Sequence, residues 1–169
     1  PALSVDGQTI GYAALHARVV DRAGAMLTSG IVPGDRVALL QARSVNLCTD
    51  LLACLHARLP LTVLSRSEAQ GSVVAKLVDG GFKGLTCDDT NREAAQALAD
   101  AAGLRLVTPP VPEDTANRHT MPVPRAEEEA LLIFTSGSSG RPKAVRLSHG
   151  NIAANTRGLS EITPVGGDD

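Results

Sequence analysis

The stretch Ala130-Leu-Leu-Ile-Phe134 runs directly into Thr135-Ser-Gly-Ser-Ser-Gly-Arg-Pro-Lys143. Five apolar residues in a row predict a buried strand, and the abrupt change to Thr, Ser and Gly predicts that the strand ends in a loop. The next residues, 144–147, again favour a strand. A flexible Ser/Gly connector rarely lies between two apolar strands with Pro-Lys at one end, so the pattern indicates a loop that binds a ligand.

The residue types of this loop suit a polyphosphate. Gly137 and Gly140 permit positive φ angles and let the backbone approach a ligand closely. Consecutive backbone N–H groups in such a turn can converge on an anion. Lys143 adds a mobile positive charge that can reach a phosphate oxygen. Four hydroxyl donors complete the set: Thr135, Ser136, Ser138 and Ser139.

Two common phosphate-binding motifs do not match. A Walker A loop places Gly directly before its Lys and Ser or Thr directly after it, whereas Pro142 precedes Lys143 and Ala144 follows it. The Gly-x-Gly-x-x-Gly spacing of a dinucleotide fingerprint is also absent. The sequence therefore disfavours a phosphotransferase with an ordinary phosphate loop.

The rest of the chain alternates between predicted strands and helices. Strands are predicted at 36–40, 61–64, 82–87 and 104–107. Helices are predicted at 12–28, 44–57, 67–78, 89–102 and about 151–162, with Ser44 capping the second and Asp89 or Thr90 capping the fourth. This alternation favours an α/β fold in which a mostly parallel sheet is flanked by helices on both faces. His149, just before the last helix, is expected to have a capping or structural role.

A proline-rich segment divides the chain. Prolines occupy positions 109, 110, 112, 122 and 124, with little apolar periodicity around them. We expect an α/β subdomain at 1–107, a linker or long loop at 108–127, and a strand–phosphate loop–strand–helix unit of the same domain at 128–169.

Composition excludes several other functions. The formal net charge of −2 gives no indication of the Lys/Arg-rich surface that binding to a nucleic-acid backbone requires. No apolar run has the length of a membrane span, and the first residues do not form a signal peptide, so we expect a cytoplasmic protein. Cys48, Cys54 and Cys87 are expected to be reduced and mostly buried, and no metal site is predicted.

Four segments resemble one enzyme superfamily in the order in which they occur. Residues 133–145 are similar to the Thr/Ser/Gly-rich signature of acyl-adenylate-forming (AMP-binding) enzymes, and 147–152 match what usually follows it. Residues 9–15 resemble the start of that family's first helix, and 31–40 its first core strand. The family includes acyl-CoA synthetases, adenylation domains of nonribosomal peptide synthetases, and luciferases.

The resemblance implies an ATP-dependent ligase and a role for the loop. A carboxylic acid substrate would attack the α-phosphate of ATP, giving acyl-AMP and pyrophosphate, and a thiol of coenzyme A or of a carrier protein would then accept the acyl group. The β- and γ-phosphates would be held by Thr135, Ser136, Gly137, Ser138, Ser139, Gly140 and Lys143. Mg²⁺ is implied, with its ligands outside this chain, and no catalytic residue is expected within it.

The chain departs from the family pattern in three places. Ala144 replaces a usual Gly after the loop lysine, and 57–64 read Ala-Arg-Leu-Pro-Leu-Thr-Val-Leu where the family usually has a small residue, Gly, an aromatic residue and Pro. The family's adenine, ribose and acyl-binding motifs would lie beyond residue 169. We therefore expect an N-terminal part of a longer ligase, inactive in adenylation by itself. The alternative is a stand-alone, non-catalytic module that binds a nucleotide or another anion.

Overall fold

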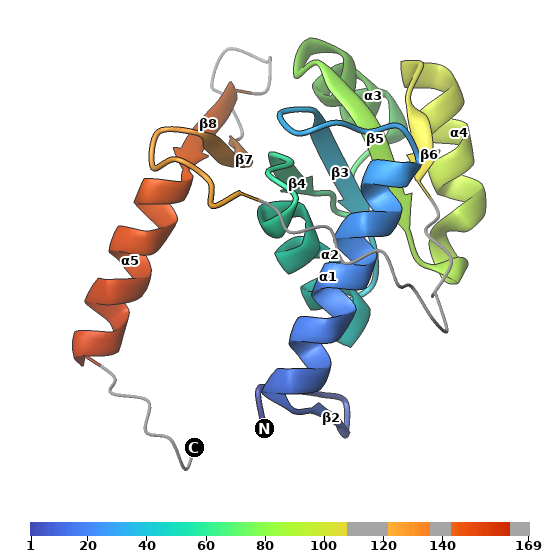
Figure 1. Ribbon diagram of the computed structural model, residues 1–169. Helices are drawn as coiled ribbons and strands as arrows, with labels where there is room; N and C mark the ends of the chain where they lie inside the picture. The colour runs from blue at the N-terminus through green and yellow to red at the C-terminus, as the bar shows by residue number, and fades with distance from the viewer. Residues whose placement is uncertain (108–121, 136–142, 163–169) are drawn as a thin grey trace.

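The computed structural model of the chain describes residues 1–107, 122–135 and 143–162 (Figure 1). Most of the predicted linker and the loop residues 136–142 lie outside the described residues. The strands are β1 (Leu3–Val5), β2 (Gln8–Ile10), β3 (Arg36–Leu40), β4 (Leu61–Val63), β5 (Phe82–Cys87), β6 (Arg105–Val107), β7 (Glu129–Thr135) and β8 (Lys143–Ser148). The helices are α1 (Tyr12–Thr28), α2 (Val45–His56), α3 (Gln70–Asp79), the short 3-10 helix η1 (Asp89–Asn91), α4 (Arg92–Ala102) and α5 (His149–Ile162).

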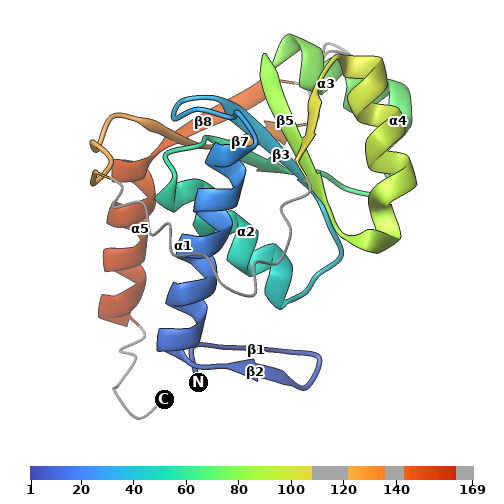
Figure 2. The same ribbon diagram turned by 45° about the vertical axis from the view of Figure 1, so that its right-hand side comes forward.

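Six strands form one sheet in the order β6-β5-β3-β4-β7-β8, which is parallel except for the antiparallel pair β7–β8. The connection through α2 leads from β3 to β4, whereas those through α3 and α4 lead the other way, to β5 and then β6. Reversing the direction of a crossover places its helix on the opposite face of the sheet. Accordingly, α1 and α2 cover one face, and α3 and α4 the other (Figure 2). The predicted α/β fold class is confirmed.

Strand β3 shows why the sheet is buried on both faces. Its side chains alternate, so Val37 and Leu39 pack in the cluster under α1 and α2, and Ala38 and Leu40 pack in the cluster under α3 and α4. All four are buried, which explains why the strand is an unbroken apolar run. In contrast, α5 buries none of its residues, and both views show it extending from the β8 edge of the sheet.

Several element ends differ from the predictions. Helix α3 begins at Gln70 rather than Ser67, because Ser65 Oγ accepts a hydrogen bond from the Ser67 amide and holds these residues in a turn. Asp88 caps η1, not Asp89 or Thr90, by accepting from the Asn91 amide at 2.9 Å. Ser44 caps α2 as predicted, accepting from the Leu47 amide at 3.1 Å.

Two Arg–Glu pairs attach the start of β7 to β3 and to the segment just before β4. Arg36 Nε and Nη2 donate to the two carboxylate oxygens of Glu129 at 2.6 and 2.9 Å. Arg58 forms the same bidentate contact with Glu128: Nε and Nη2 donate to the two carboxylate oxygens at 2.8 and 2.7 Å. Since β7 pairs with β4 only at Leu61↔Leu131, these charged contacts supplement a short ladder.

No helix within the described parts of the chain combines the length and the apolar character needed to span a membrane.

Candidate functional site

The predicted phosphate loop is closed at its base by a pair of strands. Thr135 is the last residue of β7 and lies opposite Lys143, the first residue of β8. The Thr135 hydroxyl donates to the Lys143 carbonyl oxygen at 3.3 Å. Both residues are exposed. The structure thus brings together the first and last of the predicted site residues, while Ser136, Gly137, Ser138, Ser139 and Gly140 lie outside the described residues.

Strand β7 holds the base of the loop through its buried half. Ala130 and Leu132 are buried in the sheet. Further along, the Phe134 ring lies 6.3 Å from the Phe82 ring, and Lys76 Nζ lies 5.3 Å from the Phe134 centroid. Lys76 also forms an ion pair with Glu68. The hydrogen bond from Lys76 has the largest effect in lowering the pKa of the Glu68 carboxyl group, and the hydrogen bond from Ser72 lowers it further. The approach to the loop is therefore fixed by packing against β5 and α3.

The base of the loop lies at the carboxyl edge of the parallel strands. In open α/β sheets, ligands bind outside this edge, next to the position where successive crossovers change direction. That change occurs here at β3 and β4, since the chain passes from β3 to β4 and then back to β5. The sequence motif and the sheet topology therefore indicate the same edge.

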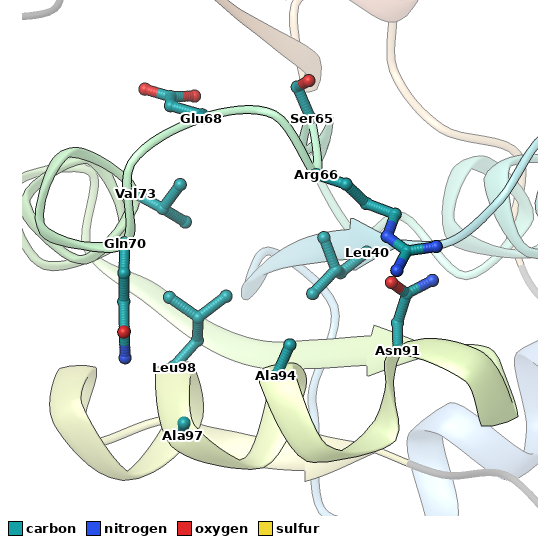
Figure 3. Close-up of a pocket in the computed structure, with 10 residues that line it drawn as sticks. All are labelled: Leu40, Ser65, Arg66, Glu68, Gln70, Val73, Asn91, Ala94, Ala97 and Leu98. Atoms are coloured by element: carbon teal, nitrogen blue, oxygen red, sulfur yellow. The ribbon is translucent and has the colours of Figure 1, made fainter.

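A cleft of about 270 Å³ opens at this edge between α3 and α4 (Figure 3). Leu40, Val73 and Leu98 point into its middle, and the side chains of Arg66 and Asn91 lie near each other on one side. The cleft is thus apolar with a polar rim, as small-molecule sites usually are. The sequence did not indicate it, because its residues come from β3, the loop after β4, α3, η1 and α4 and share no motif.

No group of three or more His, Cys, Asp or Glu side chains in the described ranges is placed to hold a metal ion. The three cysteines are free thiols, with Cys54 and Cys87 buried and Cys48 half-buried. Burial, followed by the charge of Asp50, raises the pKa of Cys54 and keeps it a neutral thiol.

His149 is a structural residue rather than the cap of α5. The Ser148 hydroxyl accepts from the Asn151 amide at 3.2 Å and so occupies the capping position. The His149 amide donates to the Glu128 carbonyl oxygen at 3.0 Å, and its Nε2 is buried without a hydrogen-bond partner among the described residues. Burial lowers the pKa of His149; the negative charge of Glu128 opposes this, and the positive charge of Arg58 adds to it.

We expect stability to fall with acidification because of His149. Its pKa is lower in the folded chain than the ordinary value of about 6.5, so the unfolded chain binds the proton more readily and stability is lost as pH falls below that value. Urea unfolding at pH 7.5 and 5.5 should show a smaller loss in His149→Gln than in the wild type. Both pH values lie above the range in which Glu128 and Glu129, whose pKa values are lowered by Arg partners, take up protons. Equal losses in the two proteins would contradict this assignment.

The family model for AMP-binding enzymes matches residues 1–169. The chain belongs to the AMP-binding enzyme family. Feruloyl-CoA synthase from Amycolatopsis sp. is 32% identical over 164 residues, which cover 96% of this chain and 33% of the relative. The phosphinothricin tripeptide synthetase PhsB from Streptomyces viridochromogenes is 30% identical over 94% of this chain and 14% of its own length.

Solved structures of AMP-binding enzymes share this fold. The ATP-bound structure of MatB from Rhodopseudomonas palustris is 27% identical with a TM-score of 0.78, covering 92% of this chain and 33% of MatB. The o-succinylbenzoate CoA synthetase MenE from Bacillus subtilis, at 19% identity, has a TM-score of 0.83 and supports the fold alone. The chain thus spans about a third of the length of feruloyl-CoA synthase and of MatB.

Proposed function

We propose that this chain is the N-terminal part of a longer ATP-dependent ligase that activates a carboxylic acid as an acyl-adenylate. The observation that carries the proposal is the Thr135↔Lys143 pair, which closes a Ser/Gly loop at the carboxyl edge of a parallel sheet. Membership of the AMP-binding enzyme family supports it, as does a MatB structure that is 27% identical and contains ATP.

In this proposal the loop binds the β- and γ-phosphates of ATP. Lys143 supplies the positive charge, and the hydroxyl and backbone N–H groups of residues 135–140 supply donors. A carboxylate oxygen forms a new bond to the α-phosphorus of ATP, the bond from that phosphorus to the oxygen bridging to the β-phosphate breaks, and pyrophosphate leaves. The protein's part in this step is to hold the reactants in line and to stabilise charge on the leaving pyrophosphate. Mg²⁺ would accompany the nucleotide, with its protein ligands outside this chain.

The acyl group would then pass to a thiol. The relatives include a CoA synthase and a peptide synthetase, so coenzyme A and a carrier-protein thiol are the two acceptors that we propose. The isolated chain is expected to be inactive, because the loop alone does not orient a carboxylate against the α-phosphate.

Two measurements test the proposal. The first is the intact mass of the natural protein in its source cells, compared with 17.5 kDa for this chain. A mass several times larger is expected, and one near this value would instead support a stand-alone anion-binding module. The second is product analysis of the full-length protein with ATP and candidate carboxylic acids. We expect carboxylate-dependent release of AMP and pyrophosphate, and release of ADP would contradict the ligase assignment.

A further inference from the structure

A charged cavity of about 540 Å³ lies at the edge of the sheet opposite the phosphate loop. Its residues come from the amino ends of β3, β4, β5 and β7 and from β8, which runs in the opposite direction. Four cations line it, Arg36, Arg58, Lys83 and Arg146, together with three carboxylates, Asp35, Glu128 and Glu129. The lining therefore carries a formal charge of 4 − 3 = +1, although the whole chain has a net charge of −2.

The excess charge is located around Glu129. This one carboxylate accepts hydrogen bonds from both Arg36 and Arg146, so the three side chains together carry one positive charge. Glu129 is largely enclosed, with 12% of its side chain exposed, whereas Arg146 has 68% exposed. Burial raises the pKa of Glu129, but the hydrogen bonds from Arg36 and Arg146 outweigh this, so the pKa is lowered and Glu129 stays ionised. Nearby, the Arg58–Glu128 pair is neutral overall.

The attachment of β7 to the sheet through Glu129 requires Arg36 but not the whole of Arg146. Arg36 already binds both oxygens of Glu129 and donates through Nη1 to the Gly80 carbonyl oxygen at 2.6 Å. Arg146 contacts Glu129 through Nε alone, which leaves its Nη groups without a partner among the described residues. The Lys83 side chain forms no hydrogen bond or ion pair with another residue in the described ranges. Cationic donors therefore border the cavity in excess of those that hold the fold together.

The positive edge extends beyond this cavity. A second hollow of similar size shares Asp35 and Lys83 with it and adds Arg105. Asp35 accepts from the Val32 amide at 3.0 Å within its own turn. Arg105 donates to the Ser29 carbonyl oxygen, which is neutral, so the charge of Arg105 is not compensated there. The second hollow adds no further acidic residue, and the two hollows together therefore carry a larger positive charge than the first alone.

We propose that the cavity between Lys83 and Arg146 is a second anion site, which binds the phosphate group of a small molecule. Guanidinium and ammonium donors at the rim of one cavity suit the several acceptor oxygens of a phosphate, and a dianion offsets the uncompensated charge around Glu129. This site is separate from the loop at Thr135 and Lys143, because the two lie at opposite edges of the sheet. It does not depend on the proposed ligase activity.

The test is a phosphate titration of the ¹⁵N-labelled chain at constant ionic strength, followed by amide NMR shifts. We expect saturable shifts at Arg36, Lys83, Glu129 and Arg146. Lys83→Gln and Arg146→Gln should each weaken binding there by about threefold to fivefold, the size expected for an exposed charged contact. Arg157→Gln removes the same charge from exposed α5 and should leave the affinity unchanged. Lys143→Ala should also leave the shifts at this edge unchanged.

The outcomes separate the site from general charge attraction and from the loop. Shifts that do not saturate, or equal weakening in Arg157→Gln, would overturn the proposal, as would shifts confined to Thr135 and Lys143. Lys83→Gln keeps the ion pairs that Arg36, Arg58 and Arg146 form with Glu128 and Glu129, so it remains informative if Arg146→Gln alters the edge. A parallel titration with glycerol 3-phosphate identifies the ligand class: tighter binding than inorganic phosphate indicates a phosphate ester, and equal binding indicates free phosphate.

Discussion

Replacing Asp50 by Ala should lower the free energy of unfolding by about 3–5 kcal/mol, which is the usual cost of removing one partner of a buried ion pair. Asp50 is fully buried on α2, and its partner Arg22 on α1 has 16% of its side chain exposed. The Asp50 carboxylate also accepts from Gln41 Nε2 at 2.5 Å and from the Thr86 hydroxyl at 3.5 Å. Removing it takes the carboxylate away from Arg22 and leaves the Gln41 amide facing a buried space that cannot solvate it.

Chemical denaturation of matched variants would measure this effect. Asp100→Ala removes an exposed carboxylate from α4 and should change stability by no more than about 0.5 kcal/mol. The double variant Arg22→Met/Asp50→Leu should cost less than the sum of the two single changes, because neither charge is then left without the other. A cost below about 1 kcal/mol for Asp50→Ala would show that this pair does not hold α1 and α2 together in the way we infer.

Elements defined by local patterns could be predicted from the sequence. The bounds of α1, β3 and β5 agree with the predicted ranges, because each is a periodic or continuous apolar segment between clear turn residues. Helix ends were less predictable, since side chains that bond to nearby amides decide them. Asp88, one residue before the predicted cap, bonds to the Asn91 amide, and α5 begins at His149 instead of about Asn151.

Contacts between distant segments could not be predicted in this way. Arg36 and Glu129 are 93 residues apart, and no local pattern indicates that they meet. The buried Arg22–Asp50 pair depends likewise on how α1 and α2 pack together on one face of the sheet. The ends of the candidate site were predictable because Thr135 and Lys143 belong to one short motif. The cleft near Leu40 and the cavity near Arg146 were not, because each combines several separate segments.

Replacing Lys143 by Ala in the full-length protein should lower kcat/KM for adenylation by about 10²–10³-fold, the range found when one donor that stabilises developing charge is removed. Lys143 is exposed at the start of β8, opposite Thr135, so the substitution removes charge and donors without opening the core. Arg157→Gln, an equal loss of charge on α5, should leave the rate unchanged. In the isolated chain we expect weak pyrophosphate binding that Lys143→Ala further weakens. Calorimetric titration would measure it, and identical affinities in the wild type and Lys143→Ala would remove the loop from the phosphate site, whatever the full-length protein does.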